Sequence, residues 1–220
     1  MQEGKIHDNV RKTAYIALMS ALLCVLCPVS VPIGPVPVSL GVFAVYLISY
    51  VLTPLQAALC CVVYLLLGAA GLPVFAGYQA GVMRVIGPTG GYLAGYLPLA
   101  FLTAWGVRTS YRRCRAAEAE EDARETDAAA NSKNTGIHTH VRRILLQSAA
   151  MLAGLFVLYV LGTAWFVFAM EGMTVMSALG VCVFPFIPFD LLKIAAALVA
   201  GNALYTALVR ANLLAPAAHS

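Results

Sequence analysis

Charged residues are scarce in this sequence. Asp, Glu, Lys and Arg make up only 11% of its 220 residues, whereas an average soluble domain has about 25%. Hydrophobic residues make up 61%, and the mean hydropathy is +0.83. A soluble fold could not bury this much apolar surface, so the composition excludes an ordinary soluble domain and predicts an integral membrane protein that needs a lipid bilayer.

The sequence also lacks the motifs that indicate catalysis or nucleotide hydrolysis. It has no His-Glu-x-x-His, no Gly-x-Ser-x-Gly and no Walker sequence. Its four histidines lie outside the apolar runs, and its six cysteines form no Cys/His cluster with zinc spacing. Basic residues are not interleaved with aromatic residues, as they are where nucleic-acid bases stack. We therefore expect no enzyme activity, no metal, no cofactor and no nucleic-acid partner.

Apolar runs separated by Pro- and Gly-rich segments define the expected helices. A helix needs about 20 apolar residues to cross a bilayer, and proline cannot continue a helix but is favoured at its start, as at Pro54. The sequence predicts an all-α, six-helix membrane bundle that forms a single domain over residues 1–220. The expected helices cover about 12–28, 38–52, 54–71, 90–108, 144–170 and 189–213.

One stretch of the chain looks soluble. Charged and small polar residues dominate between Arg108 and Arg143, and such a composition buries too little apolar surface to order itself. We expect residues 109–143 to form a flexible charged linker, with at most a transient helix near 115–125.

The distribution of basic residues predicts the orientation in the membrane. All of the 14 Lys and Arg residues except Arg84 and Lys193 lie in the termini or in the linker after the fourth expected helix. Cytoplasmic segments accumulate Lys and Arg, and an even number of spans brings both termini and this linker to the same side. Both termini and the linker are therefore expected to be cytoplasmic, and the three Pro/Gly-rich loops are expected to face outward.

Asp190 and Lys193 are the strongest candidates for a binding site. They lie three residues apart at the start of the last expected helix, so they are neighbours on one helix face. Ionisable groups near a bilayer are costly unless they are paired or face a polar cavity. The pair is either an interfacial capping pair, favoured by the helix dipole at Asp190, or a polar pair that points into a ligand pocket.

The segment 87–92 places glycines and a hydroxyl where a loop becomes a helix. Thr89, Gly90 and Tyr92 belong to this junction, and backbone N–H groups at a helix start can hold an anion or a carbonyl. The alternative interpretation is a tight turn with no ligand.

A stripe of small residues in the first expected helix could contact another helix. Ala17 and Ala21 lie four residues apart, and small residues allow close approach between helices in a membrane. Such stripes also occur in helices that merely pack within one bundle.

Five ordered segments resemble the BioY family, the biotin-binding S components of energy-coupling-factor (ECF) transporters. The resemblance covers nearly the whole chain apart from the charged linker. The matching segments are PIGPVPV at 32–38, YLLLGAAGLPVFAG at 64–77, GPTGGY at 87–92, YVLGTAW at 159–165 and PFIPFDLLK at 185–193.

The resemblance implies a function and a set of partners. It implies a six-helix S-component fold in the bacterial cell membrane that binds biotin near the outer face, beneath the loops after the first and third helices. Asp190 and Lys193 would contact biotin. Ala17 and Ala21 would face the transmembrane coupling protein, and two cytoplasmic ATPases would complete the importer.

The proposed ligand chemistry extends the candidate site. Asp190 and Lys193 can complement the N–H groups and the carbonyl of the biotin ureido group, whereas the biotin carboxylate needs Arg84 or the backbone N–H groups of segment 87–91. The candidate ligand-binding residues are Asp190, Lys193, Arg84, Gln79, Thr89, Gly90, Tyr92 and Tyr159.

Three alternative functions remain open. The chain could be an S component for another vitamin, because a scaffold does not fix its ligand. It could be a solitary biotin facilitator that works without ATPases. It could also be an intramembrane enzyme with Asp190 and Lys193 as acid and base, although the sequence offers no recognisable nucleophile.

Overall fold

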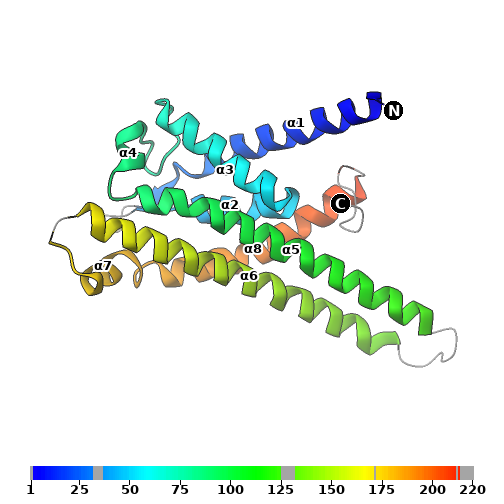
Figure 1. Cartoon of the computed structure of the whole chain (residues 1–220). Coiled ribbons are helices and arrows are strands. Elements are labelled where there is room, and N and C mark those ends of the chain that lie inside the picture. Colours follow the sequence, from blue (N-terminus) through cyan, green and yellow to red (C-terminus); the bar gives the residue numbers. More distant parts are fainter. Residues whose placement is uncertain (1, 32–36, 125–131, 171, 212, 214–220) are drawn as a thin grey trace.

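The computed structural model is an elongated bundle of helices (Figure 1). It describes residues 2–31, 37–124, 132–170, 172–211 and 213. Two short strands, β1 (Ser30–Val31) and β2 (Val38–Ser39), pair in antiparallel register. The helices are α1 (Gln2–Leu26), α2 (Gly41–Val51), α3 (Pro54–Ala69), α4 (Val82–Ile86), α5 (Gly90–Arg124), α6 (Ser132–Ala169), α7 (Val175–Cys182) and α8 (Ile187–Arg210). The all-α fold class is confirmed.

The two ends of the bundle differ in what they contain. Figure 1 places α4 and α7 at one end, here named the loop end, and the start of α1, the end of α5, the start of α6 and the end of α8 at the other, the terminal end. At the loop end, the Gly77 N–H donates to the Pro28 carbonyl at 3.0 Å, which joins the loop after α3 to the loop after α1. At the terminal end, Tyr15 Oη donates to the Leu213 carbonyl at 2.6 Å. The described parts of the loops after α1 and α3 therefore meet at the loop end.

The α2–α3 hairpin shows how sequence fixes a helix boundary. Thr53 caps α3 by accepting from the Gln56 N–H at 3.3 Å, and the Gln56 side chain accepts from the Thr53 N–H at 3.0 Å. This is a reciprocal capping box, and Pro54 occupies the first helical position, where its missing N–H costs nothing. The chain therefore ends α2 and begins α3 within a few residues.

Glycines bring α5 and α6 into close contact. A Cβ at Gly95 would lie 2.6 Å from a Leu158 methyl carbon, and one at Gly154 would lie 2.9 Å from a Leu99 methyl carbon. A Cβ at Gly91 would overlap Trp165. Small residues at helix contacts are typical of membrane bundles, where close van der Waals packing drives association. The long antiparallel helices α5 and α6 thus pack closely against each other along the bundle.

Helix α5 continues into the stretch that the sequence predicts to be a flexible linker. The structure is helical over 109–124 and again over 132–143, and residues 125–131 lie outside the described part of the chain. Ala, Arg and Glu are strong helix formers, and extending an existing helix avoids the cost of nucleation. The structure therefore differs from the expected linker, because composition alone does not account for a helix that has already begun in the membrane.

Other boundaries also differ from those expected. Helix α1 begins at Gln2 rather than near residue 12, and α4 and α7 fall in segments predicted to be loops. Helices α6 and α8 are long and apolar enough to cross a membrane, over His140–Ala169 and Ile187–Arg210. Helix α2 has 11 residues, or about 17 Å, compared with a hydrocarbon core of about 30 Å. The prediction of six spans stays a prediction.

Candidate functional site

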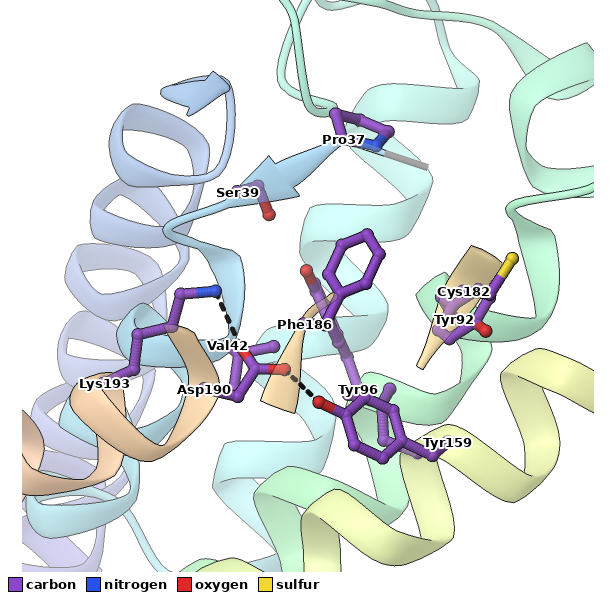
Figure 2. Close-up of a pocket in the computed structure, with 11 residues that line it drawn as sticks. Pro37, Ser39, Val42, Tyr92, Tyr96, Tyr159, Cys182, Phe186, Asp190 and Lys193 are labelled. Carbon is purple, nitrogen blue, oxygen red and sulfur yellow. Dashed lines mark hydrogen bonds and ion pairs between the residues drawn. The ribbon is translucent and has the colours of Figure 1, made fainter. Parts of the chain in front are cut away.

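A small cavity lies at the loop end, where α2, α5, α6 and α8 meet the segments around α7 and β2 (Figure 2). Its volume is about 60 Å³. Its lining residues are Pro37, Ser39, Val42, Tyr92, Tyr96, Leu158, Tyr159, Cys182, Phe186, Asp190 and Lys193.

A buried carboxylate is the centre of this cavity. Lys193 Nζ donates to Asp190 Oδ1 at 2.7 Å, and Tyr159 Oη donates to Asp190 Oδ2 at 2.6 Å. Figure 2 shows the two donors reaching the carboxylate from different sides. The side chains of Asp190 and Lys193 are only 3% and 11% exposed. Each oxygen of Asp190 therefore has one short, strong bond.

The start of α8 positions this pair. Pro188 lies in the first turn of the helix, and the Asp190 N–H donates to the Phe186 carbonyl at 2.8 Å. Phe186 is the N-cap and makes no side-chain capping bond. Since the bonds to the Asp190 carboxylate come from the Lys193 and Tyr159 side chains, the geometry favours a pocket-facing pair over a simple capping pair.

Aromatic rings form much of the remaining wall. Tyr92 and Tyr96 lie one helical turn apart on α5, and Phe186 faces them from the start of α8. The Tyr92 and Thr163 hydroxyl groups are 3.3 Å apart, within hydrogen-bonding distance. The cavity thus combines one ionic centre with flat apolar surfaces, which is typical of small-molecule sites.

The cavity is too small to hold a bicyclic ligand as it stands. Its volume of about 60 Å³ compares with roughly 300–1,000 Å³ for ligand pockets in general. Pro37 and Ser39, which come from the segment after α1, and Phe186 line the cavity together with Asp190. Lining residues have to move before the cavity can hold a ligand of that size.

The structure brings four of the eight predicted ligand-binding residues together, and these are Asp190, Lys193, Tyr159 and Tyr92. The other four do not line this cavity. The Gln79 backbone pairs with Phe75 in an isolated bridge, and Arg84 lies in the last turn of α4. The loop after α3 therefore contributes no lining residue among those described.

Thr89 and Gly90 form part of the turn between α4 and α5 in this structure. The Thr89 carbonyl accepts from the Tyr92 N–H at 3.1 Å, and the Gly90 N–H donates to the Gly87 carbonyl at 2.9 Å. A Cβ at Gly90 would overlap the Val85 carbonyl. These N–H groups are engaged within the turn, so the geometry favours the tight-turn interpretation of this segment.

The sequence reasoning did not identify several lining residues. Tyr96 lies four residues after Tyr92, and Phe186 lies four residues before Asp190, so helical spacing could have identified both. Ser39 belongs to β2 and carries no comparable signal. Its hydroxyl oxygen accepts from the Gly41 N–H at 3.2 Å, which joins this part of the cavity wall to the start of α2.

The predicted small-residue stripe lies on α1. Ala17 and Ala21 are both exposed, in line with the exposed Leu18 and Val25. Neither alanine lines the cavity. The structure therefore leaves this apolar face of α1 available for contact with lipid or with another helix.

No group of three or more His, Cys, Asp or Glu residues that could hold a metal occurs in the described part of the chain. The fold and the cavity define a helical membrane protein with a small-molecule pocket at one end of its bundle. The BioY family model matches residues 2–210, and the chain belongs to the BioY family.

Named relatives share different portions of the chain. "Biotin transporter BioY2" of Lactococcus lactis subsp. cremoris is 40% identical over 107 residues, which is 49% of this chain and 57% of that protein. "Biotin transporter BioY" of Thermotoga maritima is 44% identical over 93 residues, 42% of this chain and 55% of that protein. The chain thus matches little more than half the length of these two relatives. A Rhizobium etli "Biotin transporter BioY" is 28% identical over 87% of this chain and 89% of its own length.

A solved structure has the same fold. The S component for biotin from an ECF-type ABC transporter superposes with a TM-score of 0.68 and covers 91% of this chain and 93% of its own. The sequence identity is 22%. This likeness supports the helical architecture of the chain.

Proposed function

We propose that this protein is the biotin-binding membrane subunit, or S component, of an ECF-type importer. The observation that carries the proposal is the buried Asp190 carboxylate, held between Lys193 and Tyr159 at the edge of a cavity. Membership of the BioY family and its relatives' names as biotin transporters support biotin as the ligand. The protein binds and delivers its ligand rather than transforming it.

The hydrogen-bonding capacity of the site suits a ureido group. An ionised carboxylate offers about four lone-pair positions, and Asp190 uses two of them, for Lys193 and Tyr159. Two positions remain for the two ureido N–H groups. A Lys ammonium has three donors, so Lys193 keeps donors for the ureido carbonyl while it holds Asp190.

Tyr159 is a positioning residue in this scheme. Its hydroxyl group donates to Asp190 Oδ2, on the oxygen opposite the one that Lys193 holds. This bond fixes the plane of the carboxylate before a ligand arrives. Such preorganisation lowers the entropy cost of binding. Tyr92, Tyr96 and Phe186 then offer ring surfaces to the apolar faces of the fused biotin rings.

The biotin carboxylate requires a partner beyond the small cavity. Arg84, in the last turn of α4 at the loop end, is the cation that we propose for this role, with Gln79 and Thr89 nearby in the chain. Movement of the segments that line the cavity would connect this loop with Asp190. Gly90 contributes through the tight turn that aligns α5.

The proposed assembly and orientation follow from charge and from α1. The predominance of Lys and Arg at the terminal end supports a cytoplasmic location for both termini in a bacterial plasma membrane. The exposed stripe at Ala17 and Ala21 is the proposed contact for the transmembrane coupling protein. Two ATPases attached to that protein would supply the energy for delivery.

A panel of radiolabelled vitamins tests the ligand assignment. The detergent-purified chain is expected to retain biotin and to reject riboflavin and thiamine. Retention of another vitamin in preference to biotin would redirect the assignment to a different S component, and uptake of biotin in cells that lack the coupling protein and ATPases would identify a solitary facilitator.

Tryptophan substitutions test the coupling surface. Ala17→Trp and Ala21→Trp are expected to abolish co-purification with the coupling protein while biotin affinity stays unchanged, because neither residue lines the cavity. Ala200→Trp, at an exposed position on α8, is the matched control. Normal co-purification of both α1 variants would exclude this surface.

A further inference from the structure

A second, larger hollow lies on the outer side of α6, where α7 packs against it. This α6–α7 groove has a volume of about 390 Å³ and is lined by α6 and by residues 175–183. An apolar cavity of roughly 150 Å³ is already large enough to bind benzene. The α6–α7 groove therefore has room for a substantial apolar guest.

The α6–α7 groove presents hydrocarbon and no free hydrogen-bonding side chain. Only Tyr159 and Thr163 contribute polar side-chain atoms to its lining. The Tyr159 hydroxyl group donates to Asp190, and the Thr163 hydroxyl group lies 3.3 Å from that of Tyr92. Both hydroxyl groups are thus committed to the neighbouring cavity, and water would find few partners in the groove.

The α6 side of the α6–α7 groove belongs to the segment His140–Ala169, which is long and apolar enough to cross a membrane. Phe156 and Val160 on α6 and Val175 on α7 border the groove and are 69%, 50% and 60% exposed. In a membrane, the molecules that meet such a surface are lipids.

We propose that the α6–α7 groove binds an acyl chain of a bilayer phospholipid. The chain would lie between α6 and α7 and fill apolar space that neither water nor the protein occupies. Burial of apolar surface from both partners supplies the packing energy.

An acyl chain at this position would also support the ligand cavity. Tyr159 belongs to both linings, because one side of the residue borders the α6–α7 groove and its hydroxyl group holds Asp190. Val183 in the groove directly follows Cys182 in the cavity. The lipid would therefore pack behind the side chains that form one wall of the biotin site. This consequence rests on the proposed function, whereas the lipid site itself does not.

Retention of lipid through detergent exchange tests the proposal. The full chain is reconstituted in nanodiscs of dioleoyl phosphatidylglycerol, transferred to detergent and examined by native mass spectrometry. Ala164→Trp places an indole in the groove, and Ala153→Trp places the same side chain on an exposed part of α6 outside it. We expect the wild-type chain and the Ala153→Trp variant to retain one phospholipid each, and the Ala164→Trp variant to lose it. Equal retention by the two variants, or no retained lipid on the wild-type chain, would overturn the proposal.

Photocrosslinking provides a second measurement that needs no variant. A phosphatidylglycerol with a diazirine in its acyl chain is retained through the same exchange and then activated. Crosslinks are expected to concentrate on residues 156–167 and 175–183. Crosslinks spread evenly over the exposed faces of α1 and α8 would contradict a specific site.

Biotin binding separates this proposal from the proposed function. If Ala164→Trp lowers biotin affinity but keeps its phospholipid, the groove accommodates part of the vitamin and the lipid proposal fails. If the wild-type chain binds no biotin but retains a phospholipid that Ala164→Trp loses, the lipid site stands and the proposed function fails.

Discussion

Helices α6 and α8 carry two polar layers, one towards each end of the bundle. The first layer joins Tyr159 of α6 to Asp190 of α8. The second joins Gln147 of α6 to Asn202 of α8, with Asn202 Nδ2 donating to Gln147 Oε1 at 2.9 Å. Each member of the second layer lies 12 positions from its counterpart, which is about 18 Å along a helix. The same helix pair thus presents two polar contacts of different chemistry.

The layers differ in how their hydrogen-bonding capacity is used. In the amide layer, Asn202 also donates to the Leu198 carbonyl at 2.6 Å and accepts from Tyr111 Oη at 2.7 Å. Tyr50 donates to Gln147 Oε1 at 3.1 Å, and Gln147 donates to Ser110 Oγ at 3.2 Å. These neutral groups satisfy one another. The Asp190 layer carries charge, borders a cavity and retains lone pairs. The amide layer thus suits a structural role, and the Asp190 layer suits the ligand-binding role proposed above.

The largest expected effect is the loss of biotin binding in Asp190→Asn. The change removes the charge that Lys193 and the ureido N–H groups require and leaves a buried ammonium unpaired, which costs about 3–5 kcal/mol. Biotin affinity should fall by a factor of at least roughly 100, since 1.4 kcal/mol corresponds to tenfold. Isothermal titration calorimetry of the detergent-purified variant measures this change. Wild-type affinity in a folded Asp190→Asn protein would remove Asp190 from the site.

Asn202→Leu should lower stability rather than biotin affinity. It removes the hydrogen bonds that Asn202 makes with Gln147 and with Tyr111, so the free energy of unfolding should fall by about 1–3 kcal/mol. Biotin affinity should remain close to wild type. Thermal unfolding in detergent is the measurement.

Thr206→Val is the matched control for Asn202→Leu. The Thr206 hydroxyl group bonds only within its own helix, to the Asn202 carbonyl at 2.8 Å, and is exposed. Its loss should change stability little. A large loss of biotin affinity in Asn202→Leu, with unchanged stability, would show that the amide layer belongs to the ligand path.

A pair of Tyr→Phe variants compares the layers through the same chemical change. Tyr159→Phe and Tyr111→Phe each delete a hydroxyl group that donates to a side-chain oxygen. Such a bond is worth about 0.5–1.5 kcal/mol to a neutral acceptor, as for Tyr111, and about 1.5–3 kcal/mol to a charged one, as for Tyr159. Tyr159→Phe should lower biotin affinity by about tenfold or somewhat more, whereas Tyr111→Phe should lower the melting temperature and leave affinity unchanged. Equal effects of both variants on affinity would contradict the division of roles.

The smallest effect is expected for Arg84→Gln. Arg84 does not line the Asp190 cavity, and an exposed or partly exposed ion pair with the biotin carboxylate contributes about 0.2–1 kcal/mol. The variant should weaken binding of biotin but not of biotin amide, which lacks the carboxylate. Arg210→Gln at the terminal end is the control. An equal loss for both ligands would assign Arg84 a structural role.

The sequence predicted the ionic layer better than the amide layer. Charge inside an apolar run identified Asp190 and Lys193, and the family resemblance added Tyr159. Gln147 and Asn202 lie in expected helices too, but a search restricted to charged groups passes over neutral amides. Tyr96 and Ser39 reach the cavity through tertiary packing, which helical spacing predicts only for Tyr96.

The helix boundaries likewise divide into those that local sequence determines and those that depend on neighbouring segments. Pro54 predicted the start of α3 because its effect is local. The helical continuation of α5 through the charged stretch, the short helices α4 and α7 and the small volume of the cavity depend on neighbouring segments. Composition averaged over a window does not contain that information.

The length of α5 connects the cavity with the terminal end of the bundle. The helix has 35 residues, and its first turns include Tyr92 and Tyr96 beside the cavity. At 1.5 Å per residue it is roughly 50 Å long, so a tilt of about 10° at the cavity would swing its far tip by roughly 9 Å. Under the proposed function, a small adjustment around the ligand would thus produce a much larger displacement at the terminal end of α5.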